Sequence, residues 1–378
     1  MSFSAAAKRL FFLDNLKAFI VCLMIIFHGA MAYMAYGPAG WYVSDPAEPQ
    51  MSLTIFIIWA DAFIVPIMFF VAGYFAINSL SVHSSGEFWK SKLVRIFIPW
   101  VLGVLLLAPL ITYSTFVSRD IAIPYMEFWG RMFFFGPIFS HVHYWFLGTL
   151  FYLYVILFVA VKFKSSLKER LTPVVPGRLQ FGITAVLSYC LTAGVCLLTG
   201  GYVDSWYTVW PVFVFQPTRL TFYIIYFFLG VYAWKRQWFS AKNQGLDSTI
   251  WLPAFVVFSV VYVAYSLFGA TIVRSQTSFL LVKMALQSLY TMTAVFGLLA
   301  IFRSRMNYTN AFLTALSSGS YAMYYVHLGI VILLNMWLLQ MAWPTYLKFA
   351  IVGGGGLIIS YIVGRIFMLL PFFSPGKR

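Results

Sequence analysis

Long, uninterrupted apolar runs constrain this chain more than any other feature of its sequence. Of its 378 residues, 62% are hydrophobic and only 9% are charged, whereas soluble domains carry about a quarter charged residues. A soluble core could not bury so much apolar surface, so lipid must be the solvent for most of the chain. The runs are also too long for the alternating strands of a membrane barrel. We therefore expect an all-α polytopic membrane protein without strands.

The apolar runs predict about ten transmembrane helices, because one span takes about 20 residues. No repeat or soluble appendix stands out, so residues 1–378 are predicted to form a single transmembrane domain. Pro66 removes a backbone donor and predicts a kink in the second span. The expected spans are 13–36, 53–79, 95–117, 143–163, 181–200, 218–235, 249–268, 279–302, 319–342 and 345–370.

Lysine and arginine are concentrated in alternate loops. With ten spans, 17 of the 25 basic residues fall on the side of the two termini and six fall on the opposite side. By the positive-inside rule, both termini are cytoplasmic. The net charge of +15 therefore reports membrane topology, and we expect the bilayer rather than nucleic acid as the partner of these bases.

Ionisable residues at bilayer depth are candidates for function, and the first span holds three. Lys17 and His28 are 11 residues apart, which places them within about 20° of each other on a helix and roughly 16 Å apart along it. Asp14 lies about 40° from His28 on the same face. This arrangement suits a long substrate with an anionic head and a reactive tip, such as a coenzyme A thioester. The alternatives are a snorkelling Lys17, a packing His28 and a first-turn acid at Asp14.

Five further polar residues lie in or next to the apolar spans. Asp61 is predicted at the depth of the first-span imidazole and could orient it, unless the two merely border an outer vestibule. Arg95 is predicted at the mouth of the third span. It is either a second contact for the phosphates of the substrate or a basic residue that only follows the positive-inside rule. His327 lines a donor channel or packs. His141 and His143 lack a third ligand nearby, so no metal is expected.

Five stretches in order resemble the acyltransferase-3 family of integral membrane acyltransferases, and the resemblance runs from about residue 9 to 370. The family usually has Arg where this chain has Lys17. The positive charge is therefore kept, but the two parallel N–H donors of a guanidinium are lost. It often has Ser in place of Ala72. The stretches are Leu13-Asp14-Asn15-Leu16-Lys17 with His28; Phe69-Phe70-Val71-Ala72-Gly73-Tyr74; Lys92-Leu93-Val94-Arg95 with Pro99-Trp100; His143-Tyr144-Trp145-Phe146-Leu147; and Ser320-Tyr321 with Tyr324 and His327.

The resemblance implies transfer of an acyl group, acetyl or succinyl, to a hydroxyl of an envelope glycan or glycolipid. The co-substrate would be cytoplasmic acetyl-CoA or succinyl-CoA, and the location a bacterial-type inner membrane. His28 would act as a general base or form an acyl-imidazole. The alternative is a polytopic transporter or lipid-linked sugar flippase, although its pseudo-symmetric halves are not visible here. The predicted catalytic residues are His28, Asp14 and Asp61, and the predicted donor-binding residues are Lys17, Arg95 and His327.

Overall fold

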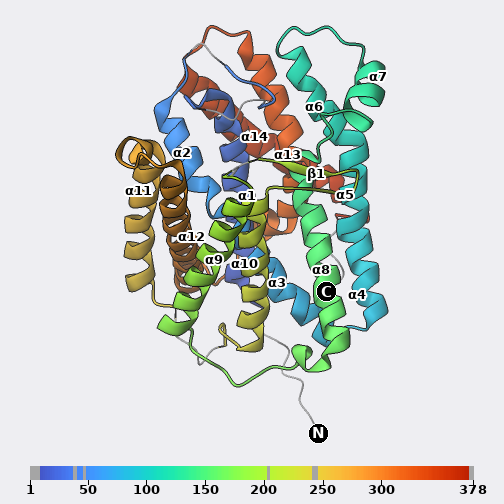
Figure 1. Cartoon of the computed structure of the whole chain (residues 1–378). Coiled ribbons are helices and arrows are strands. Elements are labelled where there is room, and N and C mark those ends of the chain that lie inside the picture. The colour runs from blue at the N-terminus through green and yellow to red at the C-terminus, as the bar shows by residue number, and fades with distance from the viewer. Residues whose placement is uncertain (1–8, 37–40, 46–47, 202–204, 241–245, 374–378) are drawn as a thin grey trace.

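The computed structural model describes residues 9–36, 41–45, 48–201, 205–240 and 246–373. In this part of the chain, nine helical stretches are long and apolar enough to cross a membrane. They stand side by side in one bundle (Figure 1), which confirms the all-α polytopic membrane fold. The helix expected at 218–235 forms as α10 (Pro217–Lys235). It is not among the nine, because Arg219 and several tyrosines make it less apolar.

The remaining helices follow the order of the predicted spans. They are α1 (Phe11–Ala30), α2 (Met51–Asp61), α3 (Ile64–Val82), α4 (Ser85–Lys92), α5 (Ile98–Leu102), α6 (Ala108–Val117), α7 (Tyr125–Glu127), α8 (Trp145–Phe163), α9 (Arg178–Leu198), α11 (Ser248–Ile272), α12 (Gln276–Arg305), α13 (Ala311–Leu339) and α14 (Thr345–Phe367), with the π-helices η2 (Leu93–Phe97), η3 (Gly103–Leu107) and η4 (Phe128–Phe134) and the 3₁₀-helices η1 (Met31–Tyr33), η5 (Val142–Tyr144) and η6 (Ser165–Lys168).

One short hairpin corrects the expectation that the chain has no strands. β1 (Tyr207–Val209) pairs antiparallel with β2 (Phe213–Phe215) in the connection between α9 and α10. Its residues are all aromatic or β-branched, and such residues favour an extended backbone. The segment lies between spans, so the length argument that excluded strands from the spans does not apply to it.

The second span is interrupted rather than kinked at its proline. The helix breaks between Asp61 and Ile64, which leaves Pro66 in the first turn of α3, where its missing N–H is tolerated. The carbonyl of Ala62, four residues before the proline, instead accepts the Thr291 hydroxyl of α12 at 3.0 Å. A freed carbonyl inside a membrane needs such a partner, and a neighbouring helix supplies it.

The third span repeats this solution at Pro99. The carbonyl of Arg95, four residues earlier, accepts the Tyr321 hydroxyl of α13 at 2.5 Å. The Pro99 carbonyl accepts the Tyr325 hydroxyl at 3.1 Å. Proline and the two π-helices η2 and η3 thus shape this span, and tyrosines one turn apart fasten it to α13.

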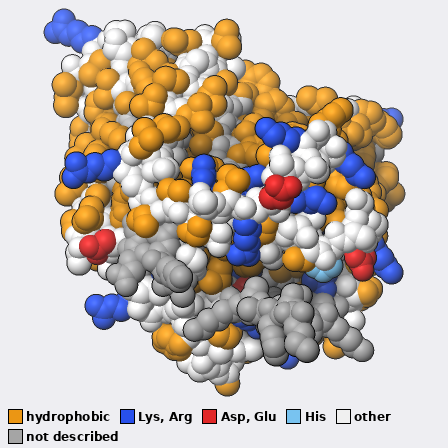
Figure 2. Space-filling view, turned by 90° about the horizontal axis from the view of Figure 1, so that it is seen from below, with side chains coloured by type: hydrophobic (Ala, Val, Ile, Leu, Met, Phe, Trp, Pro, Cys, Tyr) orange, Lys and Arg blue, Asp and Glu red, His pale blue; other side chains and the backbone are white. Residues whose placement is uncertain are grey.

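Lys and Arg side chains gather at the end of the bundle where α1 begins. Figure 2 shows this end, with basic side chains spread over it among few acidic ones. The gathering agrees with the predicted loop asymmetry. That this end faces the cytoplasm remains a prediction from the positive-inside rule.

Candidate active site

Helix α1 carries two charged groups, Asp14 and Lys17, near its basic end and one imidazole, His28, near the other end. It is a continuous helix of 20 residues, so Lys17 and His28 keep the separation of roughly 16 Å expected from 1.5 Å per residue. Lys17 Nζ lies 3.0 Å from Asp14 Oδ1, and Arg9 Nε lies 2.9 Å from Asp14 Oδ2. Asp14 therefore holds Lys17 at the basic end, and it lies about four turns from His28.

Three imidazoles meet at the other end of α1, and we call them the histidine cluster: His28, His143 and His327. His28 Nδ1 lies 2.9 Å from His327 Nε2. The rings of His143 and His327 are 5.0 Å apart between centroids and nearly perpendicular. His327 is fully buried and His143 is 6% exposed, whereas His28 is only partly buried. The cluster thus joins α1, η5 and α13.

Tyrosines of α13 fix the histidine cluster to the backbone. The Tyr324 hydroxyl donates to the His143 carbonyl at 2.6 Å. The Tyr324 carbonyl lies 2.5 Å from His327 Nδ1, and the Tyr325 carbonyl lies 3.2 Å from His143 Nε2. The rings are thereby held in set orientations, which a reaction at one ring nitrogen requires.

Asp61, expected to orient His28, has a different partner. Its carboxylate pairs with Arg219 of α10 at the break between α2 and α3. The hydrogen-bond partner of His28 is His327 instead. A similar depth in the membrane did not place Asp61 and His28 on facing sides of their helices.

Arg95 stands on η2, in the basic half of the third span. The neighbouring Lys92 lies over the rings of Phe88 and Tyr154, at 5.1 and 4.7 Å from their centroids. Because Tyr321 binds the Arg95 carbonyl, the backbone that presents the guanidinium is fixed to α13. The predicted donor residues therefore separate: Lys17 and Arg95 lie in the basic half, and His327 contacts His28.

The segment 41–45 covers the histidine cluster from the end opposite the bases. The Trp41 ring stacks on His28, with 5.8 Å between centroids and 6° between planes. Asp45 Oδ2 lies 2.6 Å from Lys348 Nζ of α14, and both side chains are at most 6% exposed. Ser118 also donates to the Tyr42 carbonyl at 2.9 Å. These contacts fix Trp41 over one face of His28.

Sequence reasoning missed Trp41 and gave His143 no role at the site. Trp41 lies in a polar connection where a tryptophan is usually interfacial, so no local signal distinguishes it. The sequence indicates His143 only as a candidate metal ligand and as part of one stretch that resembles the family. In the described part of the chain, no group of three His, Cys, Asp or Glu side chains is placed to hold a metal.

His141 lies two residues before His143 in the chain and is neutral. Burial lowers its pKa to about 4, against the opposing effect of the Pro211 carbonyl. Trp100 Nε1 donates to His141 Nδ1 at 3.4 Å, so the other nitrogen, Nε2, carries the proton and donates to the Pro211 carbonyl at 3.1 Å. His141 thus secures the loop of the hairpin to the third span.

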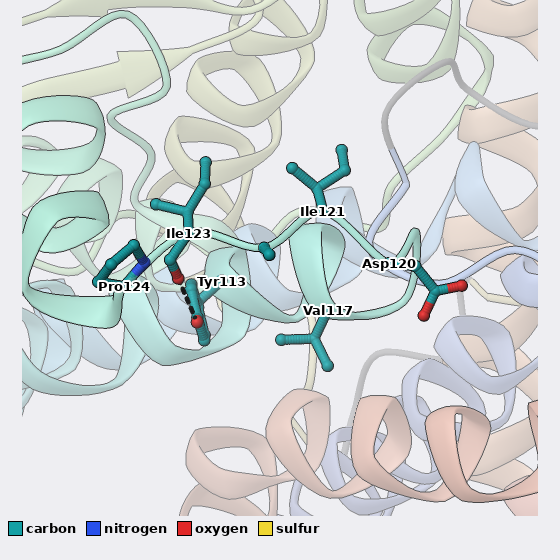
Figure 3. A pocket seen from close by; sticks show the side chains of 7 residues that line it. Tyr113, Val117, Asp120, Ile121, Ile123 and Pro124 are labelled. Atoms are coloured by element: carbon teal, nitrogen blue, oxygen red, sulfur yellow. Dashed lines mark hydrogen bonds between the residues drawn. The ribbon is translucent and has the colours of Figure 1, made fainter.

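A shallow depression lies elsewhere, at the end of α6 (Figure 3). It is lined by Tyr113, Val117 and residues 120–124. The Tyr113 hydroxyl donates to the Ile123 carbonyl at 2.7 Å and closes one side of it. None of the predicted site residues lines the depression, and we assign it no part in the chemistry.

Comparison with known proteins decides the family. The model of the acyltransferase-3 family, described as an acyltransferase domain, matches residues 10–365. The chain belongs to the acyltransferase-3 family. It is 24% identical to glucans biosynthesis protein C of Escherichia coli O6:K15:H31 (strain 536 / UPEC) over 98% of this chain and 95% of that protein. The protein of the same name from Escherichia coli O139:H28 (strain E24377A / ETEC) gives the same identity and coverage. No solved structure matches the chain significantly.

The acyltransferase is thus a multi-pass membrane enzyme. Family membership favours acyl transfer over the transporter or flippase considered as the alternative. Three of the five stretches that carried the resemblance lie together in space: those of α1, η5 and α13 meet in the histidine cluster.

Proposed function

We propose that this acyltransferase moves an acyl group, acetyl or alternatively succinyl, from cytoplasmic acyl-CoA to a hydroxyl of an envelope glycan or glycolipid. The bacterial-type inner membrane is the proposed location. The observation that carries the proposal is the continuous helix α1, with Lys17 at the basic end and His28 in the histidine cluster. Similarity to glucans biosynthesis protein C over nearly the whole chain supports a glucan as acceptor.

The donor enters at the basic end in this proposal. Its phosphates bind Lys17 and Arg95, and Asp14 keeps the Lys17 ammonium in place through the 3.0 Å ion pair. Coenzyme A is a polyanion with a long arm, so a basic mouth attracts its head. The arm then runs along α1, and its thioester arrives at His28, roughly 16 Å further along the helix.

His28 then promotes attack by the acceptor hydroxyl. The imidazole takes the hydroxyl proton as the oxygen bonds to the thioester carbonyl carbon. The carbon–sulfur bond breaks, and the proton returns to the sulfur, which leaves as free coenzyme A. In the two-step alternative, the imidazole attacks the thioester first and coenzyme A leaves as its thiolate; the hydroxyl then takes the acyl group from the ring, and its proton goes to the thiolate. A trapped acyl-histidine would select the second route.

Purified full-length enzyme in nanodiscs tests the proposal, with acetyl-CoA or succinyl-CoA, a glucan acceptor and release of free thiol as the readout. Lys17→Gln and Arg95→Gln should each weaken CoA binding, and Lys17→Arg should be tolerated. Arg9→Gln is the matched control, because it removes the other cation of the Asp14 pair without touching the proposed phosphate contacts. Unchanged CoA affinity in Lys17→Gln and Arg95→Gln would refute the donor site.

His28→Ala tests the reacting group. It should lower kcat by about 10²–10⁴-fold, the usual worth of general-base catalysis, with CoA affinity retained because the lost interaction belongs to the transition state. Near-normal acyl transfer by His28→Ala would exclude both routes.

A further inference from the structure

The hydrogen-bond partners of the histidine cluster determine which ring nitrogens carry hydrogen. A carbonyl oxygen only accepts hydrogen bonds, so His327 Nδ1, 2.5 Å from the Tyr324 carbonyl, must carry a hydrogen. A neutral imidazole has one N–H, and His327 is fully buried, with an imidazole and a carbonyl as its hydrogen-bond partners. A second proton there would be a costly buried charge. His327 Nε2 is therefore an acceptor.

The same reasoning identifies the ring nitrogen of His28 that carries hydrogen. Its Nδ1 lies 2.9 Å from that acceptor nitrogen, so Nδ1 of His28 is the donor. The ring also hydrogen-bonds the Met24 carbonyl, one turn earlier on α1. With Nδ1 as the donor to both acceptors, Nε2 holds the lone pair. Trp41 covers one face of the ring by stacking, which leaves the in-plane lone pair of Nε2 unobstructed by that contact.

We propose that His327 is a positioning residue: it accepts the Nδ1 proton of His28 and thereby makes Nε2 of His28 the reacting atom. This inference rests on the proposed function and deepens it. It also replaces the expectation that His327 binds the donor and that Asp61 orients the imidazole. A histidine here fills the place that a carboxylate has in hydrolase triads, without putting a negative charge into the membrane.

The role is consistent with either chemical route. When the acceptor hydroxyl gives its proton to Nε2, His28 becomes an imidazolium, and its hydrogen bond to His327 becomes charge-assisted and stronger. The proton then leaves from the same nitrogen to the departing sulfur. In the two-step route, Nε2 attacks the thioester carbon, the carbon–sulfur bond breaks, and coenzyme A leaves as its thiolate. The acceptor hydroxyl then attacks the acyl carbon, the bond to Nε2 breaks and returns the lone pair to that nitrogen, and the hydroxyl proton neutralises the thiolate. Neither route adds or removes a net proton at His327.

Two substitutions at one position separate positioning from donor binding. His327→Leu has a similar volume but removes the acceptor, so kcat should fall about 100-fold, within the range for a misdirected general base, while KM for acyl-CoA stays unchanged. His327→Gln can place its amide oxygen near the position of Nε2 and should recover much of kcat. A rise in KM for acyl-CoA with unchanged kcat in His327→Leu would instead show that His327 binds the donor, and it would overturn the inference.

Nitrogen-15 NMR of ring-labelled histidine gives a readout that does not depend on activity, since the chain has only five histidines. His28 and His327 should carry their proton on Nδ1. His141 and His143, whose Nε2 atoms donate to carbonyls, should carry theirs on Nε2 and serve as internal references. Observation of His28 with its proton on Nε2 would overturn the inference.

The variants also distinguish the two proposals. An active His28→Ala enzyme contradicts the proposed mechanism as a whole. An inactive His28→Ala enzyme together with fully active His327→Leu contradicts only the positioning role. If His327→Leu does not fold, as judged by aggregation in gel filtration, the NMR assignment in the wild-type enzyme and the His327→Gln kinetics decide the question.

Discussion

The contact between α3 and α10 leaves no room for a single added carbon. A Cβ at Gly73 would lie 1.9 Å from the carbonyl oxygen of Phe227, and a Cβ at Gly230 would lie 2.0 Å from that of Phe70. Carbon and oxygen that are not bonded approach to about 3.3 Å, so Gly73→Ala requires the helices to separate by about 1.4 Å. The obstacle is backbone, which cannot rotate away as a side chain can.

We therefore expect Gly73→Ala to destabilise the fold strongly. Overpacking of a core usually costs about 1–3 kcal/mol, and the rigid obstacle places this substitution at about 3 kcal/mol or more. Small residues have this role in membrane helix contacts generally. The close backbone contact also gives a physical reason for the glycine in the Phe69–Tyr74 stretch that resembles the family.

The free energy of unfolding by SDS titration in mixed micelles measures the effect. The matched control is Gly182→Ala in α9, where an added Cβ meets nothing within 4 Å. That variant should match the wild type or gain up to about 1 kcal/mol from helix propensity. Equal unfolding free energies for Gly73→Ala and Gly182→Ala would show that α3 and α10 do not pack as described.

Three further outcomes are expected. Asp45→Asn leaves the buried Lys348 ammonium without its carboxylate and should cost about 3–5 kcal/mol in unfolding free energy; a loss below about 1 kcal/mol would contradict a buried pair. His141 has a folded pKa of about 4, below its ordinary value of about 6.5, so the folded state binds fewer protons and its stability falls as pH drops from 6.5 toward 4. His141→Phe should flatten that dependence relative to the wild type, and an unchanged slope would contradict the lowered pKa. In intact cells, impermeant thiol reagents should label cysteines introduced at 201–217 but not at 164–180; the reverse pattern would invert the orientation.

The sequence determines the spans because span length and apolarity are local properties. The shared face of Asp14, Lys17 and His28 was predictable for the same reason: three positions on one helix are related by a fixed rotation. The pairing of Lys17 with Asp14 extends that local relation.

Contacts between helices were beyond sequence reasoning. Similar depth suggested Asp61 beside His28, but depth says nothing of which way a helix faces, and Asp61 pairs with Arg219. The His28–His327 bond joins residues 299 positions apart. It depends on how α1 and α13 pack, which no single-helix pattern encodes.

The π-helix η2 gives the third span one place where a residue can be gained or lost. A π-turn holds one residue more than an α-turn, so the five residues Leu93–Phe97 absorb an extra position without turning the residues that follow. Deleting one of them would restore α-helical winding and leave Trp100 facing His141 and the Pro99 carbonyl facing Tyr325. A deletion inside a regular α-helix such as α8 would instead rotate everything after it by about 100°. Single-residue gaps between relatives are therefore expected in η2 and should be selected against within the regular α-helices.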